Sequence, residues 1–313
     1  MGRDETRARK YMMKPGRADK TQEILMLLPM SIGFAIFVLY PIIWVIRWAW
    51  FEYDGYTTAT FIGFENFIRA FTRDPRFWRS LGNTMYIAAI KLVIEIPLAM
   101  LLAAFLTSKI RGSAIFRVSY FLPSVLSVAV VGLIFSIMFS SYNGIVNALL
   151  RSLGFIRKNI NFLGRRENAF FVIILVSLWT SFGLNMIYFI MGYQNIPKDL
   201  YECAAIDGAN VVQQFLHITV PLVAPVLQLV IMLSFLGTLR MTDLILVLTN
   251  GAPGGTTEVV MTYIFKYFFQ YGEAMTRTQF GYASALAVIT AVILAVITLV
   301  YLRLSKRMKQ IQG

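Results

Sequence analysis

Long apolar runs, separated by polar and basic segments, repeat along the chain from residue 24 to residue 302. Several of these runs hold twenty or more residues without a charge, the length that a helix needs to cross about 30 Å of hydrocarbon. A transmembrane barrel would instead show short segments of alternating polarity. The pattern predicts six spans, at residues 24–46, 82–108, the first two-thirds of 118–150, 168–192, within 218–247, and 278–302. We therefore predict an all-α polytopic membrane protein with six transmembrane helices.

The segments between the runs predict the domain organisation and the orientation. With both termini inside, the inner segments carry 15 Lys and Arg residues and the outer segments carry 11, which is the direction of the positive-inside rule. The basic loop that ends at Glu167 goes against that rule. The predicted units are an inner tail (1–23), the first transmembrane helix (24–50), an external loop (51–80), a core domain with five transmembrane helices and an inner loop at 199–221 (81–303), and a second inner tail (304–313).

Composition narrows the class of protein further. Hydrophobic residues make up 58% of the 313 residues, and the net charge is +13. The basic residues collect at both ends, so membrane orientation explains the charge and nucleic-acid binding does not. The single Cys203 excludes an intrachain disulfide, and together with the single His217 it makes neither a zinc site nor a catalytic dyad. No small-residue cleavage site follows the first apolar run, so no cleaved signal peptide is expected.

A few polar residues interrupt the predicted spans. Lys91 and Glu95 are four residues apart and share a helical face, and charges at membrane depth face protein or water rather than lipid. They are either a pair on a transport pathway or a structural ion pair. Arg240 and Asp243, three apart near the outer end of the fifth span, are predicted to form an ion pair within or between helices. Asn83 and Gln228 stay ambiguous, and His217 is predicted to pack at the inner loop.

The inner loop has a definite local pattern. Pro197 suits a first helical turn, and Asp199 and Glu202 suit the positive end of the helix that follows. Asp207 and Gly208 break that helix, because glycine permits positive φ, and "VVQQFLHI" then resumes one. The small residues at 203–205 and 209 allow another surface to approach closely, so we predict a docking ridge.

This loop resembles the EAA signature of binding-protein-dependent ABC importer permeases, which reads roughly E-A-A-x-x-D-G-A, x5, F-x-x-I-x-x-P. The match runs through "ECAAIDGA" to Phe215, Ile218 and Pro221, with Cys203 in place of an alanine. The resemblance implies a type I importer fold and a coupling helix in which residues 199–216 dock on an ATPase. The alternative is an interfacial amphipathic helix without a partner, which would not need the Asp-Gly break. The coupling residues so implied are Glu202, Cys203, Ala204, Asp207, Gly208, Ala209 and Phe215.

Other segments resemble sugar-importer permeases of the maltose and glycerol-phosphate type. "LTNGAPGGTT" is similar to the turn after their fifth span, with Ala252 in place of one glycine, and "FGYASALAV" is similar to the start of their last span. "LGNT" and "YFLPSVLS" resemble motifs at the second and third spans. The resemblance covers nearly the whole chain from Pro41, and favours the maltose-F-like half of a heterodimeric pair.

The resemblance also implies a substrate pathway for a sugar on the fourth and fifth spans. Several of the implied positions carry small hydroxyl side chains, which suit a polyol ligand. The alternative is close helix packing through the same small residues. The implied residues are Ser177, Thr180, Ser181 and Leu184, with Asn185 and Tyr188 nearby, and Ser234, Gly237, Thr238 and Met241.

The implied assembly has several chains. This chain has no phosphate-binding loop of the G-x4-G-K-[ST] kind, so we predict that it is not an enzyme and binds no cofactor. ATP and Mg would be used by two partner ATPase subunits. A second, homologous permease would complete the pathway, and a solute-binding protein would deliver the sugar. The predicted location is a bacterial or archaeal cell membrane, with both termini in the cytoplasm.

Two alternatives remain open at this point. An importer of the same class could carry a glycerol phosphate or another solute. A basic pocket would favour phosphate, and the implied pathway positions hold no basic residue. An ion-coupled secondary transporter would show inverted repeats and broken helices with ion ligands. No repeat is found, but Lys91 and Glu95, as charges within a span, leave that alternative open.

Overall fold

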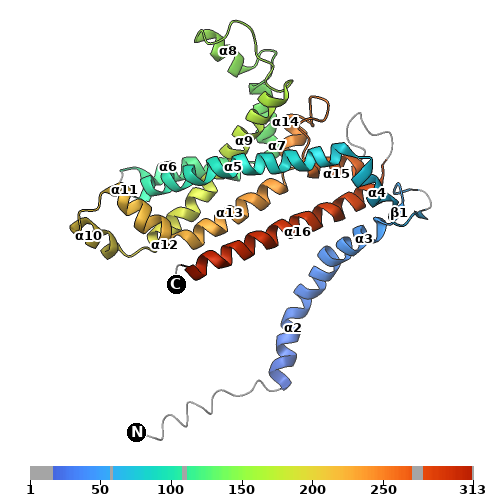
Figure 1. Ribbon diagram of the computed structural model, residues 1–313, viewed down its shortest axis with the longest axis horizontal. Helices are drawn as coiled ribbons and strands as arrows, with labels where there is room; N and C mark the ends of the chain where they lie inside the picture. Colours follow the sequence, from blue (N-terminus) through green and yellow to red (C-terminus); the bar gives the residue numbers. More distant parts are fainter. Residues whose placement is uncertain (1–16, 57–58, 108–110, 270–277, 312–313) are drawn as a thin grey trace.

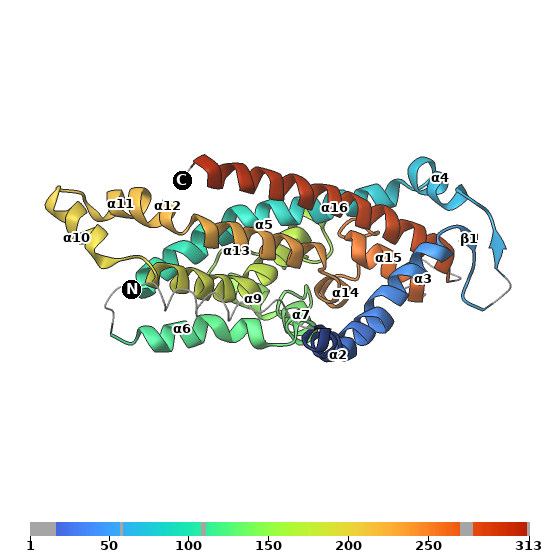
Figure 2. The ribbon, with the colours of Figure 1, turned by 90° about the horizontal axis from the view of Figure 1, so that it is seen from below.

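The computed structural model describes residues 17–56, 59–107, 111–269 and 278–311. It is an elongated helical bundle in which α5, α13 and α16 run along the long axis (Figures 1 and 2). The helices and the two short strands follow in the order α2 (Arg17–Phe34), η1 (Ala35–Leu39), α3 (Tyr40–Trp48), β1 (Phe51–Glu52), β2 (Thr60–Phe61), α4 (Glu65–Thr72), α5 (Pro75–Thr107), α6 (Ser113–Phe121), η2 (Leu122–Val125), α7 (Val128–Met138), α8 (Ile145–Ser152), α9 (Arg166–Gln194), α10 (Lys198–Ile206), α11 (Val211–Gln214), η3 (Phe215–Thr219), α12 (Val220–Leu222), α13 (Ala224–Leu239), α14 (Asp243–Leu248), α15 (Val260–Phe269) and α16 (Phe280–Ile311).

Within the described residues, four helical segments are long and apolar enough to cross a membrane unbroken. They are Gln22–Trp48, Pro75–Thr107, Arg166–Gln194 and Phe280–Arg303. Two further pairs of helices pass the same test together but are sharply bent, so the count is six if each bent pair is one span. The predicted fold class, an all-α polytopic membrane protein, is confirmed.

The bent pairs add a bend to two of the predicted spans. The third was expected in the first two-thirds of 118–150, where α6 and η2 meet α7 at 95°, at the turn that follows Pro123. The fifth was expected within 218–247 with a break near its outer end. It bends by 70° between α12 and α13, and α13 then ends at Leu239, four residues before α14 begins. The segments at 145–152 and 260–269, predicted as external loops, hold α8 and α15.

The N-terminal helix leans away from the bundle (Figure 1). No residue in its most apolar window is buried, and only its outer part, α3, packs against α16. Between α2 and α3 the chain makes the π-helical turn η1, immediately before Pro41. Since proline has no N–H, a wider turn accommodates the missing hydrogen bond. The two halves of this span therefore differ in their surroundings: α3 packs on α16, whereas α2 has no comparable packing against the described bundle.

Three apolar clusters hold the bundle together. The cluster at the end away from α10 and α11 (Figure 1), which we call the outer cluster, joins α4, α5, α15 and α16 around Phe77 and Leu286. A second joins α5, α7, α9 and α14 around Ile87 and Ile173. The cluster nearest α10 and α11, which we call the inner cluster, joins α5, α9, α12 and α13 around Ile96 and Phe189. Along α5, the polar residues Lys91 and Glu95 thus fall between two of these apolar clusters.

Buried polar contacts fix the outer cluster. The carboxylate of Asp74, 8% exposed, accepts hydrogen bonds from the hydroxyls of Tyr263 at 2.8 Å and Tyr282 at 2.6 Å. Burial raises the pKa of the Tyr263 and Tyr267 hydroxyls, so both stay neutral and able to donate. This explains how α15, which carries two of these tyrosines, is held against the bundle.

The two ambiguous amides of the predicted spans have structural contacts. The Asn83 side chain donates to the carbonyl oxygens of Thr256 and Glu258 at 2.9 and 2.8 Å, which ties α5 to the turn after α14. Gln228 accepts a hydrogen bond from Ser305 at 2.6 Å through its side chain, and one from Tyr301 at 2.6 Å through its carbonyl. Asn83 therefore ties α5 to a turn, and Gln228 ties α13 to α16.

Candidate functional site

A cavity of about 300 Å³ lies among α5, α9, α13 and the breaks next to α7 and α14; we call it the central cavity. Irregular backbone at membrane depth is tolerated where it lines a cavity, and both breaks do so here. Residues 123–128 lie at the bend between η2 and α7, and residues 240–243 separate α13 from α14. The lining residues are Lys91, Pro123, Ser124, Leu126, Val128, Ser177, Thr180, Ser181, Gly237, Arg240, Met241, Thr242, Asp243 and Leu244.

Beside the central cavity, the carboxylate of Glu95 is the centre of a polar network. Glu95 is 0% exposed. It accepts hydrogen bonds from the hydroxyls of Ser181 and Ser234, and from the Asn185 amide at 2.9 Å. Lys91 lies one helical turn away, with its ammonium 3.8 Å from Glu95 Oε2. We call these five residues the Glu95 network. It joins α5, α9 and α13 through a single carboxylate.

The structure divides the predicted pathway residues into three groups. Five of the ten line the central cavity: Ser177, Thr180, Ser181, Gly237 and Met241. Asn185 and Ser234 do not line it but bond to Glu95, as Ser181 also does. The remaining three do neither: Leu184 is 38% exposed, Tyr188 packs against the inner cluster, and Thr238 donates to a carbonyl of its own helix.

Five polar residues of the cavity were not among the predicted pathway positions. They are Lys91, Ser124, Arg240, Thr242 and Asp243. The pair predicted between Arg240 and Asp243 is wrong, because α13 ends before Arg240 and the described residues show no ion pair between the two. The implied pathway positions hold no basic residue, but Lys91 and Arg240 line the same cavity as five of them. The sequence signal that could have identified the charged cavity residues is that they interrupt otherwise apolar runs.

The α10–α11 loop, residues 198–214, lies at one end of the bundle (Figure 1). The predicted helix, turn and second helix are all present: α10 ends at Ile206, Gly208 has φ +82°, and α11 begins at Val211. Ala209 N–H donates to the Ala204 carbonyl and Gly208 N–H to the Ala205 carbonyl, the pair of bonds that closes a helix with a left-handed glycine. A capping box between Asn210 and Gln213 starts the second helix.

Much of this loop is apolar and exposed. Ile206 is 85% exposed and Val211 80%, and a groove of about 300 Å³ runs along the turn, lined by Ala204, Asp207, Gly208, Ala209, Gln213, Gln214, His217 and Ile218. Glu202 and Cys203 are exposed beside it. Phe215 differs from the rest of the predicted coupling set, because it packs against the inner cluster.

His217 is exposed in the structure. Its Nδ1 lies 3.0 Å from the Gln213 carbonyl of the same helical segment, and it lines the groove of the α10–α11 loop. His217 thus lies at the loop, as predicted, with its side chain exposed.

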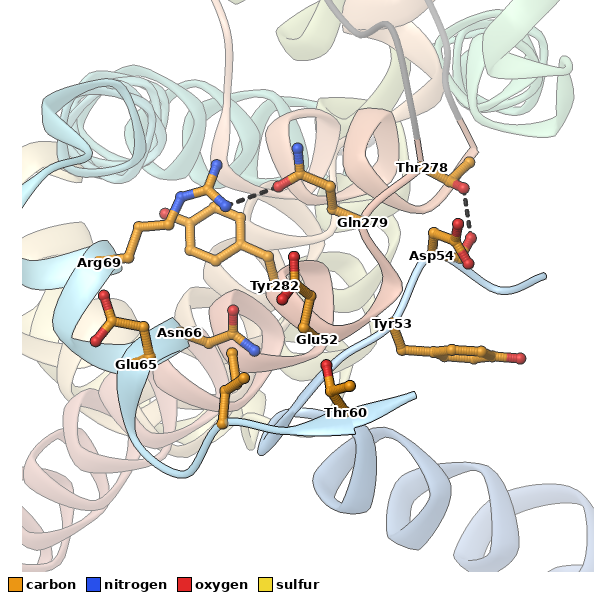
Figure 3. A pocket seen from close by; sticks show the side chains of 11 residues that line it. Glu52, Tyr53, Asp54, Thr60, Glu65, Asn66, Arg69, Thr278, Gln279 and Tyr282 are labelled. Atoms are coloured by element: carbon orange, nitrogen blue, oxygen red, sulfur yellow. Dashed lines mark hydrogen bonds between the residues drawn. The ribbon is translucent and has the colours of Figure 1, made fainter. Parts of the chain in front are cut away.

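A larger cavity, of about 460 Å³, opens at the opposite end of the molecule (Figure 3). Arg69 reaches across it, stacking 3.8 Å above the ring of Tyr282 and donating to Gln279 at 2.8 Å. Its wall is polar, with Glu52, Glu65 and Asn66 among the lining residues. None of the predicted pathway or coupling residues lines this outer cavity, so size alone does not identify the functional site.

Comparison with known proteins gives a family and a fold. Residues 95–310 match the family described as binding-protein-dependent transport system inner membrane component. The chain is 33% identical over 293 residues to the arabinooligosaccharides transport system permease protein AraP of Bacillus subtilis (strain 168), covering 93% of this chain and 90% of that protein. It is 29% identical over 286 residues to the trehalose/maltose transport system permease protein MalF of Thermococcus litoralis, covering 90% and 92%.

A solved structure has the same architecture. The fold superimposes with a TM-score of 0.79 on a chain of a bacterial alginate ABC transporter in complex with an alginate pentasaccharide-bound periplasmic protein. The two chains are 25% identical, and the match covers 92% of this chain and 94% of that one.

Proposed function

Because this chain belongs to the family of binding-protein-dependent transport system inner membrane components and is a permease subunit of an ABC importer, we propose that it forms half of the pathway for a sugar or an oligosaccharide. The observation that carries the substrate class is the central cavity, whose wall combines the hydroxyl residues Ser177, Thr180 and Ser181 with apolar side chains. Sugars are bound by such hydrogen-bonding groups and apolar faces together. The relatives named for arabinooligosaccharides, trehalose/maltose and alginate support the same class.

The α10–α11 loop docks on an ATPase subunit. Apolar side chains exposed at the end of the bundle, at Ile206 and Val211, mark an interaction surface. The turn at Gly208 and the small residues Ala204 and Ala209 leave a groove beside them. Closure of the ATPases on ATP then moves this loop, and through it the inner ends of α9 and α13, which the loop connects.

The rest of the assembly follows from the same role. A second, homologous permease covers apolar surface that this chain leaves exposed, two ATPases bind ATP and Mg, and a solute-binding protein delivers the substrate at the outer end. The end that carries the α10–α11 loop lies in the cytoplasm, with both termini on that side. ATP binding shifts the bundle between inward-open and outward-open states, as alternating access requires.

The docking surface is tested with the single, exposed cysteine. A short crosslinker with a maleimide for the Cys203 thiol and a photoreactive diazirine for any neighbouring residue, added to membranes that hold the full complex, is expected to join Cys203 to the ATPase subunit, and the product is identified by mass spectrometry. The Cys203→Ser variant is the control and gives no product. An ATPase that copurifies with this chain but never crosslinks through Cys203 would place the docking surface elsewhere.

The role of the cavity is tested by filling it. Gly237 lines the cavity and a Cβ there meets nothing within 4 Å, so Gly237→Leu is expected to lower sugar uptake at least tenfold without preventing assembly. Gly82→Leu is the matched control, because Gly82 is an exposed α5 glycine outside the cavity that is equally open. Equal uptake by the two variants would show that substrate does not pass the central cavity.

A further inference from the structure

The central cavity holds charged side chains whose hydrogen-bonding capacity the protein itself does not satisfy. Lys91, from the middle of α5, is 5% exposed, whereas Arg240 and Asp243 are exposed at the break between α13 and α14. All three line the same cavity as the hydroxyl residues of α9. The buried ammonium of Lys91 needs partners, because burying a charge without them costs free energy.

The nearest partner of Lys91 is already satisfied by others. Glu95 accepts hydrogen bonds from Ser181, Ser234 and Asn185, which is close to the number that a carboxylate accommodates. The Lys91 ammonium stays 3.8 Å from Oε2, beyond the length of a hydrogen bond. Among the described residues, this ion pair is its one charged contact. The pair fixes the position of the ammonium, and its three donors remain available to the contents of the cavity.

Arg240 is likewise available. Within the described part of the chain, its guanidinium makes no hydrogen bond and no ion pair, although Asp243 is three residues away. The helix break at 240–242 holds the two side chains apart. A guanidinium is always charged and presents a planar fork of donors that matches a carboxylate. Facing the cavity there are thus two cations, Lys91 and Arg240, and one carboxylate, Asp243, since Glu95 is not among the lining residues.

We propose that the central cavity takes a saccharide that carries a carboxylate, with Lys91 and Arg240 binding that carboxylate. Ser177, Thr180 and Asp243 bind the sugar hydroxyls, and Glu95 is a positioning residue that holds Lys91 in place. This inference rests on the proposed function, because it names the substrate class of the same cavity. A neutral sugar would leave Arg240 without a charged partner and the Lys91 ammonium without a charged group within hydrogen-bond distance. An anionic one pairs with them in a site partly shielded from water, where such hydrogen bonds are strong.

The experiment compares two matched ligands on the purified complex, reconstituted in nanodiscs without the solute-binding protein. The probes are α-1,4-linked trigalacturonate and α-1,4-linked galactotriose at millimolar concentrations, which differ in their carboxylates. The readout is the rise in the unfolding midpoint that each ligand causes. Trigalacturonate is expected to raise the midpoint more than galactotriose does. Its apparent affinity should fall about tenfold in Lys91→Met and in Arg240→Gln, as expected when one charge-assisted hydrogen bond is lost.

Lys91→Met leaves Glu95 without its ion pair and could disturb folding. Arg240→Gln is the second variant because Arg240 has no partner among the described residues, so its loss should leave the fold intact. Arg73→Gln is the control: Arg73 is an exposed arginine that pairs with Glu65 on the outer surface, and its removal should change nothing. Equal midpoint shifts for the two saccharides, no shift for either, or undiminished trigalacturonate affinity in both variants would overturn the inference. ATP hydrolysis by the same preparation, stimulated by the binding protein, shows separately whether the proposed importer function stands.

Discussion

Polar and apolar side chains are arranged in opposite ways in the Glu95 network and the α10–α11 loop. In the network a carboxylate is 0% exposed and takes its partners from α9 and α13, inside the bundle. In the loop, Ile206 and Val211 are 85% and 80% exposed, and the polar residues bond mainly to their own backbone. The Glu95 carboxylate finds its hydrogen-bond donors within this chain, whereas the loop exposes apolar side chains. Substitutions in the first should therefore change stability, and substitutions in the second should change coupling.

Two glycines show the same difference. A Cβ at Gly183, in α9, would stand 1.8 Å from the Tyr120 carbonyl oxygen of α6, so close helix approach requires glycine there. At Gly208 a Cβ would meet nothing within 4 Å, but φ is +82°, a conformation that side chains disfavour. The first glycine is needed for packing between distant segments, and the second for a turn that its own neighbours define.

The largest effect is expected from Glu95→Leu. Removing the carboxylate leaves Lys91 and the three donors without their partner, which should lower the free energy of unfolding by about 3 to 5 kcal/mol. The measurement is the thermal unfolding midpoint of the purified complex. Glu95→Gln should lose less, because its amide oxygen still accepts. The double variant Lys91→Met with Glu95→Leu should recover part of the lost stability. An unfolding midpoint unchanged by Glu95→Leu would show that the Glu95 network does not stabilise the fold.

Gly183→Ala comes next. The added methyl group meets backbone rather than a movable side chain, so α9 and α6 must separate, at a cost of about 1 to 3 kcal/mol. The same midpoint measures it. Gly33→Ala in α2 is the control, because a Cβ there meets nothing within 4 Å and alanine favours a helix. If the two variants had the same unfolding midpoint, close packing at Gly183 would not be needed.

Gly208→Val tests the coupling role of the α10–α11 loop. The positive φ makes a β-branched residue unfavourable by about 1 to 2 kcal/mol, so the turn reorganises and sugar uptake should be lost while the chain still inserts and assembles. Uptake and ATP hydrolysis are measured together in proteoliposomes. Gly112→Val is the matched control. Gly112 also has positive φ, +83°, and open space around it, but it precedes α6 and is outside the α10–α11 loop. Normal uptake in Gly208→Val would contradict the coupling role of the loop.

The smallest effect is expected from Asn210→Ala. It removes the side chain that caps α11, worth about 1 kcal/mol. It should speed amide hydrogen exchange at Gln213 and Gln214, whose N–H groups bond to Asn210, about fivefold, with little change in the unfolding midpoint. Asn210→Asp keeps a capping oxygen and should exchange as the native loop does. Unchanged exchange in Asn210→Ala would mean that contacts outside the capping box hold α11.

The sequence allowed the family, the helical class and the α10–α11 turn to be predicted, and the comparisons confirm the family. These predictions succeed because each depends on neighbouring residues: charge-free runs for the spans, and Asp207 with Gly208 for the turn. The coupling role of the loop, the domain boundaries and the pathway residues stay predictions. The bend in the third span was not predicted, because an apolar run does not show where a helix breaks. The break after Pro123 is tolerated since it lines a cavity, a fact of tertiary packing.

What the sequence determined by itself is therefore local: which segments are apolar enough to cross a membrane, and where a short helix must stop. What the tertiary structure decided is which polar residues meet. Ser181 and Ser234 lie 86 and 139 residues from Glu95, and no spacing rule connects them. The Arg240–Asp243 pair, which spacing did suggest, does not form because the helix ends between them. In an apolar interior a polar group takes whichever partner the packing brings within reach, and that depends on how distant helices cross rather than on the order of residues along one of them.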